Sequence, residues 1–449
     1  MSRYETYKPS GIQWIGEVPE HWDRKRFRYC FENSKGLSIT KENLVEVGIP
    51  CVNYGEIHSK YGFKVDPEVN ELLCVDEKYL ETNQSSILSE GDFVFADTSE
   101  DIEGSGNFTH LVGKQKIFAG YHTIISRLRV KSVPRFIAYF FESVGFRNQI
   151  RREIQGVKVF SITNKILKDT ILFLPEYSEQ LTIANYLDDQ TQKIDRLIAN
   201  KKAQAEKLKE LRQIEINNAV TKGLNSNAEM KNSGIEWMGK IPKHWEVNRL
   251  KNSTFINQSV ISEKTSPDYL IKYIDISNVN SMGEFIELQE MEFSEAPSRA
   301  RRVPKHNSIL LSTVRTYLRA IALVQNPDEN LIASTGFAVI DANQNLFDAG
   351  YLYFQMISHI LVERVIANSE GVSYPAISST KLGDIKIVIP PKNEQAEIAN
   401  FLQKRTTAID QLIKNIEAQI DKLQELRKIK IYEAVTGKIK VNAYAETTA

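Results

Sequence analysis

The sequence contains two copies of one unit. Residues 10–22, SGIQWIGEVPEHW, recur at residues 233–245 as SGIEWMGKIPKHW. Residues 174–224 align without a gap to residues 389–439, and about half of the aligned positions are identical. A repeat on this scale restricts the architecture, because each copy must build the same supersecondary unit. The chain is therefore expected to fold as two equivalent units, each a globular head followed by a long helix.

Between the repeated segments the two copies diverge. Residues 23–173 and 246–388 resemble each other only faintly, for example around Gly120 and Gly336. The two heads are therefore expected to hold the same place in the architecture but to carry different surfaces, as they must if each recognises something different.

The segments that follow the heads have the apolar periodicity of long amphipathic helices, with apolar residues at intervals of three, four or seven. This apolar stripe, assigned to a coiled coil and to partner contacts, includes Ile194, Ile198, Leu208 and Leu211 in the first copy and Ile409, Ile413, Ile416, Ile420 and Leu423 in the second. Ser178 and Asn393 are the expected N-caps, and Gly223 and Gly437 the expected stops.

A helix of about 40 residues rises roughly 60 Å, far more than one head needs for its own core. Two arrangements would bury its stripe: each helix folds back on its own head, or the two helices pair as an antiparallel coiled coil. The second is favoured because helix one leads out of head one into head two, and helix two must return. It predicts neighbouring termini and a pseudo-two-fold relation between the halves.

Each head alternates short apolar runs with turn residues, which indicates short strands. Strands are expected at residues 86–88, 93–96, 308–312, 321–324 and 337–340, and helices at 134–153 and 348–368. The expected fold class is α+β, with two mixed α/β heads separated by two long antiparallel coiled-coil helices. The expected boundaries are residues 1–176 for head 1, 177–223 for the first helix, 224–391 for head 2, 392–439 for the second helix and 440–449 for a C-terminal tail.

All four tryptophans lie in the first pair of repeated segments: Trp14, Trp22, Trp237 and Trp245. They are either exposed stacking platforms or anchors packed on the adjoining domain. An aromatic segment punctuated by Gly and Pro that leads into a domain is more often an anchor, and this interpretation is favoured.

Fifty-seven Lys and Arg balance fifty-seven Asp and Glu, so any nucleic-acid surface must be local. Basic clusters and two glycine turns supply candidate contacts to phosphates or base edges. These candidates are Arg127, Arg129, Gly156 and Lys158 in the first head, and Arg301, Arg302, Arg315, Arg319, Gly371, Ser373 and Tyr374 in the second. The alternative is that the basic runs are solvated faces and the turns mere connections.

Motifs for chemistry are missing from the sequence. It has no glycine-rich cofactor turn with an Asn/Asp-Pro-Pro-Tyr/Phe loop, no GxxxxGK(S/T), no HExxH or His/Cys metal cluster, and no GxSxG. No metal site is expected. No stretch approaches 18 apolar residues and the N-terminal residues lack an apolar signal region, so we expect a cytoplasmic protein with no membrane partner.

The chain resembles the specificity subunit of Type I restriction–modification systems. The resemblance rests on the paired WIGEVPEHW and WMGKIPKHW segments, the LP-EQ-IA-L pattern at residues 174–187 and 389–402, the IDxLI cores at 194–198 and 409–413, and the AVTKG and AVTGK ends. It covers essentially the whole chain, and two spaced sets of motifs that each occur twice are more specific than either set alone.

This resemblance implies that each head is a target recognition domain for one half of an asymmetric, bipartite site in double-stranded DNA. The helices would set the distance between the halves and dock two modification subunits, which use S-adenosylmethionine to methylate adenine. Two restriction subunits would add translocation and cleavage with ATP and Mg²⁺, so this chain would bind no cofactor and perform no chemistry. The alternatives are a coiled-coil adaptor whose heads bind proteins or glycans, and a free-standing nuclease or methyltransferase.

Overall fold

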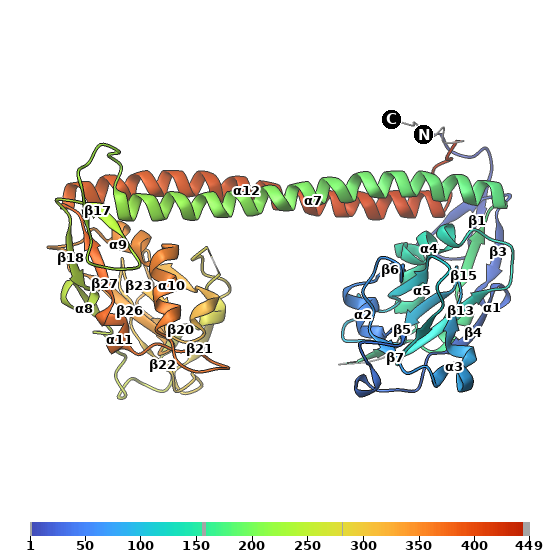
Figure 1. Cartoon of the computed structure of the whole chain (residues 1–449), viewed down its shortest axis with the longest axis horizontal. Coiled ribbons are helices and arrows are strands. Elements are labelled where there is room, and N and C mark those ends of the chain that lie inside the picture. Colours follow the sequence, from blue (N-terminus) through green and yellow to red (C-terminus); the bar gives the residue numbers. More distant parts are fainter. Residues whose placement is uncertain (1, 155–158, 281, 443–449) are drawn as a thin grey trace. The chain divides into compact units, whose positions relative to one another are not determined.

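The computed structural model describes residues 2–154, 159–280 and 282–442. The chain forms two compact units, one made of the residues up to Lys201 together with those from Ala418 onward, the other of Lys202–Glu417. Two long helices, α7 (Tyr177–Lys222) and α12 (Lys392–Val435), each contribute residues to both units (Figure 1). Each unit is therefore one head completed by parts of both long helices.

Head 1 is built on a five-stranded sheet of order β4-β13-β9-β11-β6 and a four-stranded sheet of order β7-β5-β12-β8. Its strands are β1 (Tyr7–Pro9), β2 (Glu17–Pro19), β3 (Asp23–Arg26), β4 (Phe31–Lys35), β5 (Ile49–Val52), β6 (Phe63–Val65), β7 (Cys74–Val75), β8 (Ile87–Leu88), β9 (Phe93–Ala96), β10 (Thr98–Ser99), β11 (Phe108–Leu111), β12 (Ile117–Ala119), β13 (Thr123–Leu128), β14 (Phe160–Ser161) and β15 (Ile171–Leu174). Its helices are α1 (Phe27–Cys30), η1 (Lys41–Asn43), α2 (Tyr54–Ser59), α3 (Tyr79–Thr82), η2 (Gln84–Ser86), α4 (Pro134–Glu142), α5 (Val144–Arg151) and α6 (Asn164–Asp169).

Head 2 has two four-stranded sheets, of order β19-β26-β23-β24 and β21-β20-β25-β22. Its strands are β16 (Met230–Asn232), β17 (Lys240–Pro242), β18 (Glu246–Arg249), β19 (Thr254–Ile256), β20 (Leu270–Ile274), β21 (Gln289–Glu292), β22 (Ala300–Arg302), β23 (Ile309–Ser312), β24 (Ile321–Leu323), β25 (Leu331–Ser334), β26 (Phe337–Ala342) and β27 (Lys386–Ile389). Its helices are α8 (Leu250–Ser253), η3 (Ile276–Asn278), η4 (Thr316–Leu318), α9 (Ala349–Met356), α10 (His359–Ala367) and α11 (Ser379–Asp384).

The two heads have matching topologies although their sequences diverge. Strands β13, β9 and β11 follow one another in the first sheet of head 1 as β26, β23 and β24 do in head 2. In each second sheet one pair is parallel, β5 with β12 and β20 with β25. The expected mixed α/β heads are therefore confirmed, and the repeat extends through the heads at the level of topology.

Each stretch expected to form one helix in a head forms two. Residues 134–153 contain α4 and α5, and residues 348–368 contain α9 and α10, so the prediction of one helix in each stretch was wrong. The breaks fall at Ser143 and Ser358, whose ψ angles of 144° and 137° are extended. The Ser143 hydroxyl accepts a hydrogen bond from the Phe146 N–H, which starts the next helix.

The tryptophan segments are anchors, as the sequence analysis favoured. Trp22 and Trp245 are fully buried. The Trp22 indole N–H donates to Glu179 at 3.2 Å, and the Trp245 indole N–H donates to Glu394 at 3.1 Å. Both acceptors lie in the first turn of a long helix, so each anchor fixes its head to the helix that follows.

The glutamine after each of these glutamates makes a second attachment. The Gln180 side chain accepts from the Val133 N–H at 2.9 Å, and the Gln395 side chain accepts from the Asp348 N–H at 2.8 Å. These bonds tie the start of each long helix to the residue before a head helix. Because α7 and α12 begin at Tyr177 and Lys392, Ser178 and Asn393 lie inside the first turn and are not the N-caps expected from the sequence.

The two long helices pack antiparallel to each other. In the first unit Arg427 pairs with Asp195 at 3.1 Å, and in the second unit the repeat-equivalent Arg212 pairs with Asp410 at 2.9 Å. The expected antiparallel pairing is confirmed. The fold-back alternative holds only for the first turns, where Ile183 joins the core of head 1 and Ile398 that of head 2.

The two ends of the described chain lie side by side within the first unit. The Lys440 N–H donates to the Ser2 carbonyl at 2.8 Å, and the Tyr7 hydroxyl donates to the Gly437 carbonyl at 2.9 Å. Gly437, just beyond α12, has a φ of 68°, as expected for a residue that stops a helix. The expected proximity of the termini is confirmed.

Candidate nucleic-acid interface

In head 2 two loops from distant parts of the sequence meet. One joins β23 to β24, and the other joins α10 to α11. The Ile377 N–H donates to the Thr313 carbonyl at 2.9 Å, and the Arg315 N–H donates to the Pro375 carbonyl at 2.8 Å. The structure therefore brings two candidates from separate clusters together: the Arg315 guanidinium lies 4.6 Å from the centre of the Tyr374 ring.

This meeting point presents exposed aromatic, basic and aliphatic side chains. We call it the arginine–tyrosine surface and define it by Arg315, Tyr317, Leu318, Val372 and Tyr374. Arg315 has a φ of 51°, in the left-handed region that an arginine rarely adopts. Strained backbone of this kind gathers at functional sites, where surrounding contacts hold it in place.

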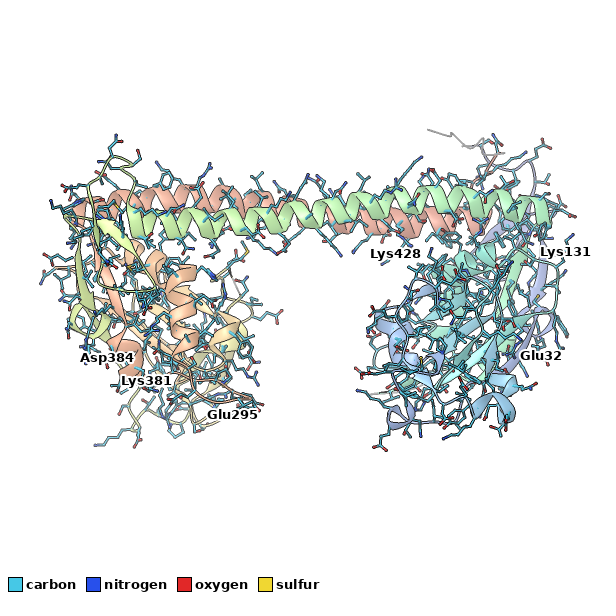
Figure 2. The ribbon with its side chains drawn as sticks, viewed as in Figure 1. Glu32, Lys131, Glu295, Lys381, Asp384 and Lys428 are labelled. Carbon is cyan, nitrogen blue, oxygen red and sulfur yellow. The ribbon has the colours of Figure 1, made fainter. Side chains whose placement is uncertain are left out.

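The neighbouring candidates in head 2 are held by other groups. Arg319, with a φ of 53°, pairs with Glu363 at 2.6 Å. Gly371 lies at the turn of the second loop with a φ of 109°. A side chain there would be strained, and its Cβ would lie 3.2 Å from the Tyr374 carbonyl oxygen. Ser373 is exposed between Val372 and Tyr374. Lys381 of α11, labelled in Figure 2, pairs with Glu370, the residue before Gly371.

Arg301 and Arg302 are the last two residues of β22, and neither guanidinium has a carboxylate partner among the described residues. The Arg301 guanidinium stands 5.5 Å from the Phe293 ring centre. The Arg302 Nε is buried and lacks a hydrogen-bond partner in the described part of the chain, and burial lowers the pKa of its guanidinium. Such a group gains from an anionic partner.

The equivalent place in head 1 carries different chemistry. The loop between β9 and β11 pairs with β14 through Thr98 and Ser161, as Val314 pairs with Ala376 in head 2. This loop is acidic, with Glu100, Asp101 and Glu103, where head 2 has arginines.

Beside the acidic loop of head 1 lies a group of aromatic and histidine rings that the sequence analysis missed. The ring centres of Tyr54 and Tyr121 are 5.6 Å apart, and those of Tyr54 and His122 are 5.2 Å apart. His122 has a φ of 55° and its Nδ1 lies 3.2 Å from Asp97. The one available signal was the Tyr-His pair after Gly120, at a turn between two apolar runs.

The candidates in head 1 differ in their availability. Gly156 and Lys158 lie outside the described residues. The Arg127 guanidinium donates to Ser34 and to the carbonyls of Ser85 and Ile87, and it pairs with Asp92 at 3.3 Å. These contacts indicate a structural role for Arg127, which bridges strands within the head.

Arg129 is exposed, and its guanidinium pairs at 3.1 Å with Glu32, which Figure 2 labels on head 1. An exposed pair of this kind is weak, so a phosphate could replace the carboxylate at little cost.

The apolar stripe of the long helices is buried in part. Ile194, Ile409, Ile413 and Ile420 are buried, whereas Ile198, Leu208, Ile416 and Leu423 are half-buried. Leu211 is 37% exposed, more than the other residues assigned to the stripe. Its repeat equivalent Leu426 is exposed as well. The seam is therefore narrower than the sequence pattern predicted.

A second apolar surface on the helices occurs once in each unit. Ile429 is 41% exposed, and its repeat equivalent Ile214 is 54% exposed. In the first unit Ile429 borders a groove of about 320 Å³ that Trp14, Val144 and Tyr432 also line. Lys428, labelled on α12 in Figure 2, stands beside this groove. We call these surfaces the Ile429 surface and the Ile214 surface.

Within the described ranges, no helix combines the length and the hydropathy needed to cross a lipid bilayer. Among the same residues, no group of three or more His, Cys, Asp or Glu side chains is arranged to hold a metal ion.

Residues 242–422 match the family described as the Type I restriction modification DNA specificity domain. The chain is 26% identical to a Methanocaldococcus jannaschii protein assigned as the specificity subunit of the type I restriction enzyme MjaX. The alignment spans 433 residues and covers 95% of this chain and 96% of that protein. The chain is 24% identical over 369 residues to the specificity subunit of the type I restriction enzyme MjaVIII of the same organism, with 80% and 82% covered. A solved chain described under complex assembly and conformational transition of the type I R-M system shares the fold, with a TM-score of 0.68 and 15% identity over 94% of this chain and 99% of that one.

Proposed function

The chain belongs to the specificity subunits of Type I restriction–modification systems, and we propose that its two heads each read one half of an asymmetric, bipartite DNA site. A specificity subunit recognises the DNA sequence and leaves catalysis to its partner subunits. The finer proposals concern how the two heads, the two helices and the partners divide this work.

The observation that carries the proposal is the chemical difference between the heads at one topological position. Both heads place the loop that follows the third strand in the order of the first sheet, β9 or β23, against a segment that follows the head helices. In head 2 that position bears Arg315 and Tyr374, whereas in head 1 it bears an acidic loop beside Tyr54, Tyr121 and His122. Base edges differ in their donors and acceptors, so unlike side chains at one position read unlike sequences.

The paired helices support a role as the spacer between half-sites. A helix pair fixes the separation of what it joins, and the repeated Arg–Asp pairs hold one register of α7 against α12 in both units. Lengthening both helices by one or two turns should change the number of unread base pairs between the half-sites and leave the half-sites unchanged. A change in the half-sites instead would show that the helices do not act as a ruler.

The Ile429 and Ile214 surfaces support docking of two modification subunits. Each unit exposes the equivalent isoleucine of a long helix, Ile429 or Ile214, so a modification subunit could contact the same helical position in both units. The modification subunits would bring S-adenosylmethionine and methylate adenine, and two restriction subunits would bring ATP- and Mg²⁺-dependent translocation and cleavage. This chain would bind none of these cofactors.

The test is to map methylated adenines in DNA from cells that carry this chain with and without its modification subunit. We expect a gapped, two-part motif that appears only when both proteins are present. No motif, with the modification subunit expressed and bound, would favour an adaptor whose heads bind proteins or glycans. Methylation or cleavage by the purified chain alone would instead indicate a free-standing enzyme.

A further inference from the structure

Arg315 differs from three of the other candidate arginines in what its guanidinium contacts, and it lies closer to its aromatic ring, at 4.6 Å, than the likewise unpaired Arg301 does to Phe293, at 5.5 Å. Arg127, Arg129 and Arg319 each pair with a carboxylate. Arg315 is exposed, and no described carboxylate lies within ion-pair distance of its guanidinium. Its five N–H donors therefore face solvent, except where the ring of Tyr374 covers the plane.

The backbone holds Arg315 in one place. Its N–H donates to the Pro375 carbonyl at 2.8 Å, and Val314 and Ala376 form a bridge one residue away on each strand. The Leu318 N–H donates back to the Arg315 carbonyl at 2.8 Å, which closes the turn η4. These contacts offset the cost of holding an arginine in the left-handed region, with its φ of 51°. A purely solvated side chain would require no such constraint.

The Tyr374 ring, whose centre lies 4.6 Å from the guanidinium carbon of Arg315, is placed to orient the guanidinium plane. A guanidinium stacked on a tyrosine ring keeps its N–H edge free, and the edge then points along the ring plane. The major groove of DNA presents two acceptors side by side at guanine, N7 and O6, and a planar pair of N–H donors matches them. Adenine offers an acceptor and a donor there, so the same edge would meet an unfavourable N–H.

We propose that Arg315, oriented by Tyr374, reads a guanine in the half-site bound by head 2. This inference rests on the proposed function, because it assigns one specificity-determining residue within it. It also predicts an asymmetry: the equivalent loop of head 1 has carboxylates, which accept hydrogen bonds and reject guanine N7 and O6.

The experiment maps the methylated motif in cells that carry the modification subunit together with the wild-type chain, Arg315→Ala, Arg315→Lys or Arg249→Ala. We expect Arg315→Ala and Arg315→Lys to relax one guanine position in one half-site, while the other half-site and the spacer stay unchanged. Arg249→Ala is the matched control, since it removes an exposed arginine of head 2 that is already paired with a carboxylate, that of Asp384, and is not a candidate contact. Its motif should equal that of the wild type.

Binding to synthetic duplexes gives the second readout. The assembled complex is titrated with duplexes that carry the mapped motif, with 7-deazaguanine in place of each guanine in turn. At one position the wild type should lose affinity, by less than the about 5- to 150-fold of a whole bidentate contact because O6 remains an acceptor, and Arg315→Ala should be indifferent to that replacement.

Three results separate the possibilities. Uniform loss of affinity for all duplexes in Arg315→Ala, with guanine preference retained, would make Arg315 a phosphate contact and overturn the inference. Unchanged motifs and affinities for Arg315→Ala and Arg315→Lys would overturn it as well. A wild-type chain that yields no bipartite motif with its modification subunit bound would overturn the proposed function first.

Discussion

The repeated Arg–Asp pairs between α7 and α12 allow a test in which the molecule supplies its own control. Arg212 and Asp410 form one pair, and Arg427 and Asp195 form its repeat equivalent, with similar distances of 2.9 and 3.1 Å. The two pairs differ in burial. The side chains of Arg212 and Asp410 are 11% and 23% exposed, whereas those of Arg427 and Asp195 are 23% and 53% exposed.

Burial sets the expected coupling energies. A hydrogen-bonded contact to a charged group that is shielded from water contributes about 1.5–3 kcal/mol, whereas a pair with one half-exposed member contributes about 0.2–1 kcal/mol. We therefore expect Arg212→Met with Asp410→Asn to show a coupling energy about 1–2 kcal/mol larger than Arg427→Met with Asp195→Asn. The substitution to methionine keeps an apolar stem, so lost packing is matched in both cycles.

The measurement is native-state hydrogen exchange of α7 and α12 peptides, resolved by mass spectrometry, for the wild type, the four single variants and the two double variants. A local readout is needed because the chain has two compact units and its unfolding is not expected to be two-state. A coupling of about 2 kcal/mol changes amide protection by roughly 30-fold. Equal couplings at the two sites, or a larger one for Arg427 and Asp195, would refute the argument from burial.

Three further perturbations have expected outcomes. Gly437→Ala should strongly destabilise the first unit in thermal unfolding, because φ is 68° and the new Cβ would lie 2.3 Å from Pro19; stability equal to wild type would contradict the close packing of that turn. Burial lowers the pKa of His110 to about 4 from an ordinary 6.5, so the unfolded state takes up the proton first as the pH falls. The first unit should therefore lose stability between about pH 6.5 and 4. Urea titrations should show this loss in the wild type and a smaller one in His110→Gln. Trp22→Phe should lower the free energy of unfolding by less than Trp22→Ala, for which about 3–5 kcal/mol is typical of a buried tryptophan. Phenylalanine removes only the hydrogen bond to Glu179 and part of the ring. Equal losses of stability in denaturant unfolding would mean that the ring contributes little.

The arrangement of heads and long helices could be predicted because the sequence repeats the unit that forms them. The repeat of the tryptophan segments and of the helical segments led to two heads, two antiparallel helices and neighbouring termini. The strands at residues 93–96 and 309–312 followed from short apolar runs between turn residues. These features depend on local pattern and on copy number, which one sequence contains.

The features that the sequence could not provide depend on contacts between distant residues. Arg127 looked like a phosphate ligand, but it bonds to Ser34 and to two carbonyls that lie far from it in the sequence. Arg315 and Tyr374 belonged to separate clusters until the loops were seen to meet. Leu211 matched the helical period, yet period alone does not say which of two adjacent stripes faces the partner helix.

Head 1 is completed by the last part of the chain. Tyr432 donates a hydrogen bond to the Trp14 carbonyl at 2.9 Å, and Ile431, Ala434 and Val435 belong to the same apolar core as Trp22. A premature stop codon before residue 430 would therefore spare the sequence of the N-terminal head and still damage its fold. Mutations in the codons for Ile431, Ala434 and Val435 should therefore destabilise head 1, although most of that head is encoded more than 200 codons earlier.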